Sequence, residues 1–215
     1  MYNDTYGDGD GRRPMKLSVL GAAGATGVPL VEQALAAGHR VTALVRIGQK
    51  LTITNPNLHV VEGDATDRAA VSEAMNGGDA VISVLGARGP VMAEATRAIV
   101  DAAKQKGPER VVMLSSFAVA RDRLTPVTKV VTGIAMGSPI KDKTAGEEVL
   151  RASSLDWTIV YPTKLTNGPK TEARVVPESE KVGMSQKISR AGVASFLLQA
   201  ATEDLYSRRG VVITG

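Results

Sequence analysis

The glycine-rich stretch near the start of the chain constrains the fold more than any other sequence feature. "SVLGAAGATGVPL", residues 18–30, places Gly21, Gly24 and Gly27 between an apolar run and a helical pattern. After a strand, the first glycine suits a tight turn, the second lets a pyrophosphate approach the backbone, and the third allows close helix packing. The helix N-terminus would then offer N–H groups to the phosphates. The stretch predicts a dinucleotide-binding turn made of Gly21, Ala23, Gly24, Ala25, Thr26 and Gly27; the alternative is a tight turn that binds nothing.

Apolar runs typical of buried strands alternate with helical patterns along the whole chain. Strands are expected over 16–20, 40–46, 58–64, 79–86, 110–116, 156–162 and 210–215, and helices over 28–38, 67–77, 90–107, 141–154 and 189–202. Strands rich in Val and Ile with little polar alternation are buried on both faces, and intervening helices imply parallel crossovers. We therefore predict an α/β Rossmann-type fold, doubly wound, with a mainly parallel sheet flanked by helices in a single domain.

The expected domain covers residues 15–215. Residues 1–14 are polar and rich in Gly and Asp, and we expect them to form a disordered tail. Two long segments, 117–139 and 163–187, contain proline and follow the carboxyl ends of expected strands. Because open α/β sheets bind ligands at that edge, we predict that both segments are substrate loops.

The end of the second expected strand indicates which dinucleotide the turn would prefer. The strand reads "VTALVRIGQK" and carries Arg46, with no acidic residue close behind. A carboxylate there would suit the ribose hydroxyls of NAD, whereas the planar fork of an arginine suits a 2′-phosphate. We predict that Arg46, assisted by Lys50, favours NADP(H) over NAD(H). The alternative is an ordinary solvated charge at a strand end.

Composition narrows the classes of function. The chain of 215 residues has no cysteine, which excludes disulfides and thiolate nucleophiles. No run approaches the ~18 apolar residues of a membrane span, and no signal-peptide pattern is present, so we expect a cytoplasmic protein without a membrane partner. The net charge of +4 is small, and aromatic residues that stack on bases make up only 3% of the chain, so we expect no nucleic-acid partner. His39 and His59 lie near strand starts, away from the ligand edge, so we expect no histidine catalyst and no metal site.

Several motifs together resemble a known group of proteins. They are "GAAGATG", "VTALVR", "VEGDATD", "AVISVLGA", "VVMLSS", "EEVLRASSLDWTIVYPT" and "ISRAGVA". Over about residues 16–215 the chain resembles the atypical short-chain dehydrogenase/reductases. It is most similar to the NAD(P)H-binding group that contains flavin reductase/biliverdin reductase B and the nitrogen-metabolite-repression-like (NmrA-like) proteins.

The resemblance implies roles for residues that follow the strands. Asp64 would accept a hydrogen bond from the adenine amino group, and Ser115 and Ser116 would lie near the nicotinamide. The other implied cofactor contacts are Ala65 beside Asp64, Leu85, Gly86 and Ala87 on the adenosine–ribose side, and Pro162 and Thr163 at the nicotinamide. The structural alternative for each of them is an ordinary turn or loop residue.

One departure from the wider superfamily bears on catalysis. Its Tyr-x-x-x-Lys pair supplies a proton, but here Pro139 stands four residues before Lys143. The proton would come instead from water or from a hydroxyl such as Ser115 or Ser116, and Lys143 would steady the ribose or a substrate carboxylate, so these three are the candidate catalytic residues. The alternative for Lys143 is a solvated charge on a helix. Hydride transfer from nicotinamide to a flat ring needs mainly orientation, because the cofactor carries the chemistry. We predict an NADPH-dependent reductase of FMN, FAD or another flat conjugated acceptor, monomeric or homodimeric. The alternative is a non-catalytic NADP(H)-binding redox sensor of the NmrA-like type.

Overall fold

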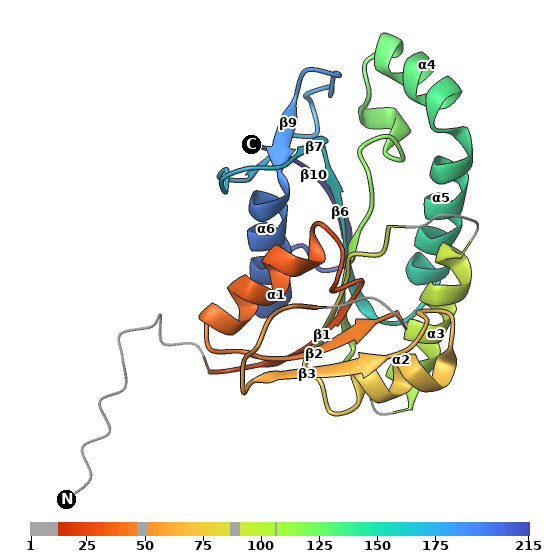
Figure 1. Cartoon of the computed structure of the whole chain (residues 1–215). Coiled ribbons are helices and arrows are strands. Elements are labelled where there is room, and N and C mark those ends of the chain that lie inside the picture. Colours follow the sequence, from red (N-terminus) through yellow and green to blue (C-terminus); the bar gives the residue numbers. More distant parts are fainter. Residues whose placement is uncertain (1–12, 47–50, 87–90, 106) are drawn as a thin grey trace, which may run out of the picture.

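A computed structural model describes residues 13–46, 51–86, 91–105 and 107–215. Within these ranges eight strands form one sheet in the order β3-β2-β1-β4-β5-β6-β10-β8, and all neighbours are parallel except β10 and β8. A second sheet consists of the short parallel strands β7 (Lys164–Thr166) and β9 (Lys187–Ser189), and it lies beside β10 (Figure 1). The strands of the main sheet are β1 Lys16–Leu20, β2 Arg40–Val45, β3 Leu58–Glu62, β4 Ala80–Ser83, β5 Arg110–Leu114, β6 Asp156–Pro162, β8 Arg174–Val175 and β10 Arg209–Thr214.

Helices cover both faces of the sheet, which confirms the predicted doubly wound fold (Figure 1). α1 (Gly27–Ala36) and α6 (Arg190–Thr202) pack together over one face, where Leu30 and Leu197 are fully buried. α2 (Arg68–Met75), α3 (Met92–Lys104) and α5 (Gly137–Arg151) cover the other, where Ile99 and Leu150 are fully buried. In the described ranges, no helix is long and apolar enough to cross a membrane.

The two segments predicted to be loops contain regular structure. Residues 117–139 hold a short 3-10 helix, η1 (Arg121–Arg123), then α4 (Pro126–Ala135) and the start of α5. Residues 163–187 hold β7 (Lys164–Thr166), β8 and the first residue of β9 (Lys187–Ser189). Pro126 does not break α4, because it occupies the first turn and Thr125 caps the helix by accepting from the Thr128 amide at 3.4 Å. That segments 117–139 and 163–187 contact a substrate stays a prediction.

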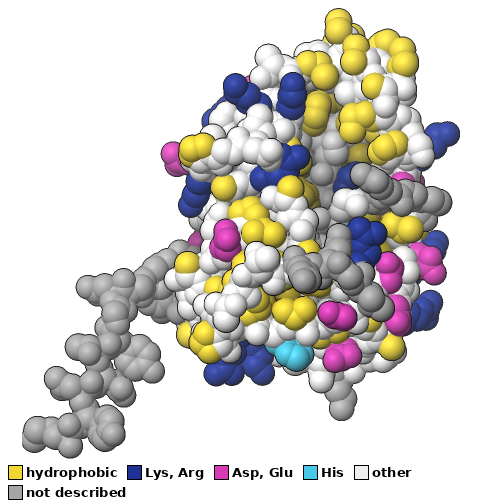
Figure 2. Space-filling model, viewed as in Figure 1, with side chains coloured by type: hydrophobic (Ala, Val, Ile, Leu, Met, Phe, Trp, Pro, Cys, Tyr) yellow, Lys and Arg dark blue, Asp and Glu magenta, His cyan; other side chains and the backbone are white. Residues whose placement is uncertain are grey.

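α4 packs against the rest of the molecule with its polar face, and its hydrophobic face is exposed. Its threonines Thr128 and Thr132 are buried, whereas hydrophobic side chains face outward. Arg121 fastens the helix by donating to the Lys129 carbonyl at 2.8 Å and to the Thr132 hydroxyl at 3.3 Å. Figure 2 shows the hydrophobic side chains gathered over α4 at the top of the molecule. The outward-facing ones are Val127 (72% exposed), Val130 (62%), Val131 (43%) and Ile134 (83%).

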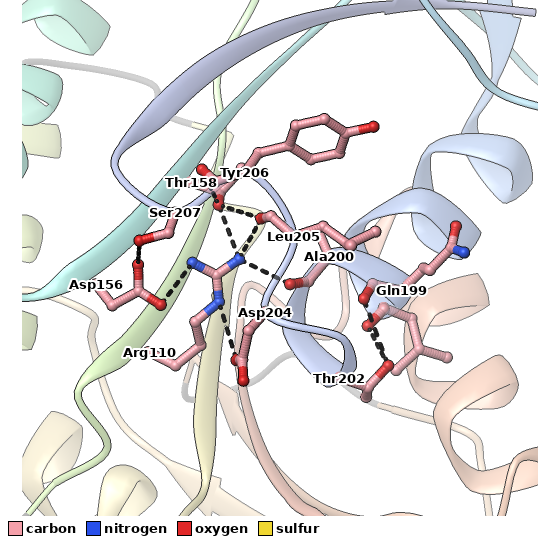
Figure 3. Close-up of polar contacts among 11 residues, drawn as sticks. Arg110, Asp156, Thr158, Gln199, Ala200, Thr202, Asp204, Leu205, Tyr206 and Ser207 are labelled. Carbon is pink, nitrogen blue, oxygen red and sulfur yellow. Dashed lines mark hydrogen bonds and ion pairs between the residues drawn. The ribbon is translucent and has the colours of Figure 1, made fainter. Parts of the chain in front are cut away.

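A buried arginine joins the start of β5 to the loop before β10 (Figure 3). Arg110 is 5% exposed, and its Nη2 lies 2.7 to 2.8 Å from the Thr158 hydroxyl and the carbonyls of Ala200 and Leu205. Asp156 pairs with its Nη1 at 3.2 Å. Burial lowers the pKa of Arg110, and the carboxylates of Asp156 and Asp204 oppose that shift. The loop that it holds has three non-glycine residues with positive φ, namely Asp204, Tyr206 and Arg208.

Candidate cofactor and acceptor site

One cavity of about 670 Å³ opens along the carboxyl ends of β1 to β6. It brings together most of the residues predicted from the sequence. Ala23 and Gly27 do not line it, and Lys50 and Ala87 fall outside the described residues. The predicted residues that line it are Gly21, Gly24, Ala25, Thr26, Arg46, Asp64, Ala65, Leu85, Gly86, Ser115, Ser116, Lys143, Pro162 and Thr163.

The three glycines of the turn each occupy a different environment. Gly21 has φ +84°, which favours glycine, and a Cβ there would lie 3.0 Å from the Val84 carbonyl oxygen. Gly24 is exposed to the cavity, and its amide donates to the Gly21 carbonyl at 3.0 Å. A Cβ on Gly27 would lie 2.2 Å from the Gly21 oxygen and 2.5 Å from the Ala22 oxygen. Gly27 therefore lets α1 begin directly against the turn, whose open side faces the cavity.

Arg46 and Asp64 line the cavity from the ends of neighbouring strands, β2 and β3. Asp64 Oδ1 accepts from the Thr66 amide at 2.9 Å and from the Thr66 hydroxyl at 2.7 Å. These hydrogen bonds, the amide first, lower the pKa of Asp64, and the Arg46 charge adds to the effect. The Asp64 carboxylate is therefore held in a fixed turn, and the exposed Arg46 side chain adds a positive charge to the same wall.

A buried polar network lies behind the opposite wall. Ser115, after β5, donates from its hydroxyl to Glu147 Oε1 at 2.5 Å. Glu147 is 5% exposed, and its Oε2 accepts from the Tyr161 hydroxyl. Arg151 donates to the Tyr161 oxygen at 2.9 Å and lies 3.7 Å from Glu147 Oε2. Burial, followed by the Glu147 charge, raises the pKa of Tyr161.

Sequence reasoning missed Glu147 as a site residue. The available signal was its spacing, four residues after Lys143 on one face of α5. Sequence reasoning also missed several cavity-lining residues, because they come from segments predicted to be loops or from a helix start. These are Phe117, Thr132, Lys164, Leu165, Met184 and Arg190.

Lys143 is half-buried in the cavity wall. Its Nζ lies 3.5 Å from the Leu114 carbonyl oxygen. Burial lowers the pKa of Lys143, and the nearby carboxylates of Glu147 and Asp142 oppose that shift. Asp142 is itself engaged, because it accepts from the Met92 amide at 3.0 Å and so caps α3.

Selective chemical labelling tests the state of Lys143. An amine with a lowered pKa is neutral, and therefore nucleophilic, at lower pH. In acetic anhydride labelling read by peptide mass spectrometry, we expect Lys143 to reach half of its maximal reactivity at lower pH than the exposed Lys141. Saturating NADPH should slow labelling of Lys143 and leave Lys141 unchanged. Equal midpoints for the two lysines would contradict the burial argument.

The sequence matches one family of known proteins over most of its length. Residues 21–204 fit the model of a family described as NAD(P)H-binding. An uncharacterized chloroplastic protein of Arabidopsis thaliana is 31% identical over 214 residues, which cover 92% of this chain and 76% of the relative. A (4-alkanoyl-5-oxo-2,5-dihydrofuran-3-yl)methyl phosphate reductase of Streptomyces griseus is 31% identical over 148 residues, or 67% of this chain and 46% of that reductase. Because this Arabidopsis relative is chloroplastic, the cytoplasmic location expected for the present chain stays a prediction.

Solved structures share the fold. ChuY, an anaerobilin reductase from Escherichia coli O157:H7, superposes with a TM-score of 0.78 at 25% identity, covering 92% of this chain and 96% of ChuY. A short-chain dehydrogenase/reductase from Veillonella parvula in complex with NADP gives a TM-score of 0.81 at 22% identity, covering 94% of both chains. The family match confirms the predicted NAD(P)H-binding resemblance, and these superpositions show the shared Rossmann fold.

Proposed function

The chain belongs to the NAD(P)H-binding family, and from that membership we propose that it is an NADPH-dependent reductase that transfers hydride to a flavin or another flat conjugated acceptor. The observation that carries the proposal is a single cavity that joins the glycine turn and Arg46 to Ser115 and Pro162. In the sheet order, these residues span from β2 across to β6. A cavity that crosses the carboxyl ends of these strands suits an extended dinucleotide, with its reactive ring near β5 and β6.

The residues of this wall fit the cofactor. Gly24 leaves its backbone open at the N-terminal side of α1, where a pyrophosphate would bind. Arg46 would hold the 2′-phosphate, and Asp64 would accept from the adenine amino group. The remaining contacts would come from Ala65, Leu85 and Gly86 along the adenosine, and from Pro162 and Thr163 at the nicotinamide. When bound, the reduced nicotinamide supplies the hydride.

The acceptor would lie against side chains from the segments 117–139 and 163–187. Met136 and Met184 line the cavity, and their polarizable thioethers suit contact with a flat ring. Lys164 and Arg190 line it as well, which favours an acceptor that carries phosphate or carboxylate groups, such as FMN. The chain supplies orientation and charge, which is what hydride transfer between two rings requires.

One observation favours the sensor as a second candidate. Pro139 stands at the position of the superfamily's tyrosine, and Tyr161 is turned toward Glu147 and does not line the cavity. A sensor needs only the glycine turn and Arg46. Turnover therefore separates the two candidates, whereas binding alone does not.

Arg46→Ala tests the cofactor preference. In titrations followed by nicotinamide fluorescence, we expect wild type to bind NADPH at least about tenfold (~1.4 kcal/mol) more tightly than NADH. The variant should lose this difference because it lacks the guanidinium for the 2′-phosphate. Arg40→Ala, at the other end of β2, is the matched control and should behave as wild type. Equal binding of the two cofactors by wild type would contradict the role of Arg46.

Adding FMN or the quinone menadione to the NADPH complex tests the reaction. Oxidation of NADPH, followed by its absorbance, is expected of the reductase. Tight NADPH binding without oxidation by either acceptor would support the sensor. Failure to bind either nucleotide would mean that "GAAGATG" is a turn without a ligand.

A further inference from the structure

The hydroxyl of Ser115 donates its only hydrogen to a carboxylate behind the cavity wall. Ser115 follows β5 and lines the cavity, and its Oγ donates to Glu147 Oε1 at 2.5 Å. Glu147 is 5% exposed on α5 and does not line the cavity. A serine hydroxyl has one hydrogen and two lone pairs, so a hydroxyl whose hydrogen is engaged can only accept further hydrogen bonds. Within the described ranges, no donor contacts the Ser115 oxygen.

The groups around Glu147 all suit a carboxylate that accepts. The Tyr161 hydroxyl donates to Glu147 Oε2, and burial, followed by the Glu147 charge, raises the pKa of Tyr161, so this hydroxyl keeps its hydrogen. The Arg151 guanidinium lies 3.7 Å from the same oxygen, and the charge of Lys143 is also nearby. An ionised carboxylate has no hydrogen to donate, and two hydroxyl donors with two cations are partners of that form. Glu147 therefore holds the Ser115 hydrogen on its own side of the wall.

The backbone donors on this part of the wall are engaged within the protein as well. The amides of Ser115, Phe117 and Thr163 donate to backbone carbonyls at 2.8, 3.2 and 2.9 Å, respectively. The Thr163 hydroxyl donates to the Thr214 hydroxyl at 3.2 Å, and Pro162 has no amide hydrogen. A ligand group that forms a hydrogen bond with Ser115 Oγ must therefore bring the hydrogen itself.

We infer that Ser115 accepts a hydrogen bond from the carboxamide N–H group of the nicotinamide, and that Glu147 is a positioning residue that keeps Ser115 an acceptor. The inference rests on the proposed binding of NADP(H) with its nicotinamide at the ends of β5 and β6. The carboxamide is the N–H donor of the nicotinamide ring, and it is attached beside the carbon that carries the hydride. Holding it would fix the rotation of the ring and hence the face that meets the acceptor.

This assignment separates the roles of two neighbouring serines. Ser116 also lines the cavity, but its oxygen accepts from the Ala118 amide at 3.4 Å, and its hydroxyl hydrogen is donated to no group in the described ranges. Ser116 can therefore still donate toward the acceptor, whereas Ser115 cannot. The proton needed after hydride transfer would come from Ser116 or from water, and Ser115 would bind the cofactor only.

A cofactor analogue without the N–H group tests the role of Ser115. The 3-acetylpyridine analogue of NADP⁺ keeps the ring and its carbonyl but has a methyl group in place of the amide nitrogen. In isothermal titration calorimetry with the oxidised forms, we expect wild type to bind NADP⁺ about tenfold more tightly than the analogue. Ser115→Ala should weaken NADP⁺ binding to the level of the analogue and leave the analogue unchanged. Ser138→Ala, exposed on α5 and outside the cavity lining, is the control and should match wild type.

Glu147→Met tests the positioning role, because methionine has a similar volume and does not hold the hydroxyl hydrogen of Ser115 as a carboxylate does. The freed hydroxyl can then donate to the carbonyl of the analogue, so we expect the analogue to bind about fivefold more tightly than it binds wild type. NADP⁺ binding should stay within about twofold of wild type, since the freed hydroxyl can still accept. Glu148→Met, at the exposed next position of α5, is the matched control and should change neither affinity. A merely structural role of Glu147 predicts weaker binding of both ligands instead.

The outcomes separate this inference from the reductase proposal. A wild type that binds NADP⁺ and the analogue equally would overturn the inference and leave NADP(H) binding standing. Equal weakening of both ligands by Ser115→Ala or by Glu147→Met would also overturn it. Discrimination against the analogue without oxidation of NADPH by FMN or menadione would support the role of Ser115 and overturn the reductase. If Glu147→Met fails to fold, wild type and Ser115→Ala still decide whether Ser115 accepts from the carboxamide.

Discussion

Gly27→Ala is expected to destabilise the chain by about 3 kcal/mol in urea unfolding, and to weaken NADPH binding at least about tenfold. The added methyl group would overlap backbone, since its Cβ would lie 2.2 Å from the Gly21 oxygen and 2.7 Å from the Ala22 carbonyl carbon. Backbone cannot rotate away as a long side chain can, so α1 or the turn must move. Either movement separates the helix N-terminus from the backbone that would hold the pyrophosphate.

The only tryptophan, the buried Trp157 on β6, reports unfolding by its fluorescence. Gly137→Ala is the matched control, because a Cβ there meets nothing within 4 Å and the residue begins a helix. It should keep or slightly raise stability, since alanine is the better helix former. If Gly27→Ala proved as stable as Gly137→Ala, the turn could not be as closely packed as described.

Arg110→Met is expected to cost about 4 kcal/mol of unfolding free energy. Methionine fills part of the space, but it removes the guanidinium that donates to the carbonyls of Ala200 and Leu205 and pairs with Asp156. The loop between α6 and β10 also loses a contact that offsets the unfavourable backbone conformation of its three residues with positive φ, Asp204, Tyr206 and Arg208. Because Arg110 begins β5 and the cavity lies at the strands' carboxyl ends, NADPH binding by the folded fraction should stay as in wild type.

Circular dichroism during urea unfolding measures this loss, with Arg68→Met as the control. Arg68 pairs with Asp101 at 2.8 Å, but its side chain is 71% exposed. An exposed pair contributes about 0 to 1 kcal/mol, so the control should change stability little. Similar losses for the two variants would mean that burial adds nothing to the Arg110 network.

The central sheet was predictable because its signal is local. β1 and β6 have the bounds expected from the sequence, because a strand that is buried on both faces appears in the sequence as a nearly continuous apolar run. The glycine turn and Arg46 were predictable for the same reason, as their positions follow directly from strand ends. Whether they bind a dinucleotide stays a prediction.

The buried networks could not be predicted, because they depend on distant segments meeting. Glu147 lies 32 residues from Ser115 and 14 from Tyr161, and each looks ordinary in its own segment. The Arg110 cluster joins residues up to 95 positions apart. α4 was missed for another reason: its glycine and proline were interpreted as breaks, and its buried face is made of threonines.

The exposed hydrophobic face of α4 affects how the cavity can open. Thr132 of this helix and Met136 directly after it line the cavity, and the valines and isoleucine of the helix already face outward. Arg121 holds this helix by hydrogen bonds to the Lys129 carbonyl and the Thr132 hydroxyl, and water can replace such bonds. Lifting α4 would therefore expose little additional apolar surface and carry a small change in heat capacity, unlike unfolding of the core. The wall of the cavity can thus be displaced by a local transition that leaves the sheet and both of its hydrophobic cores intact.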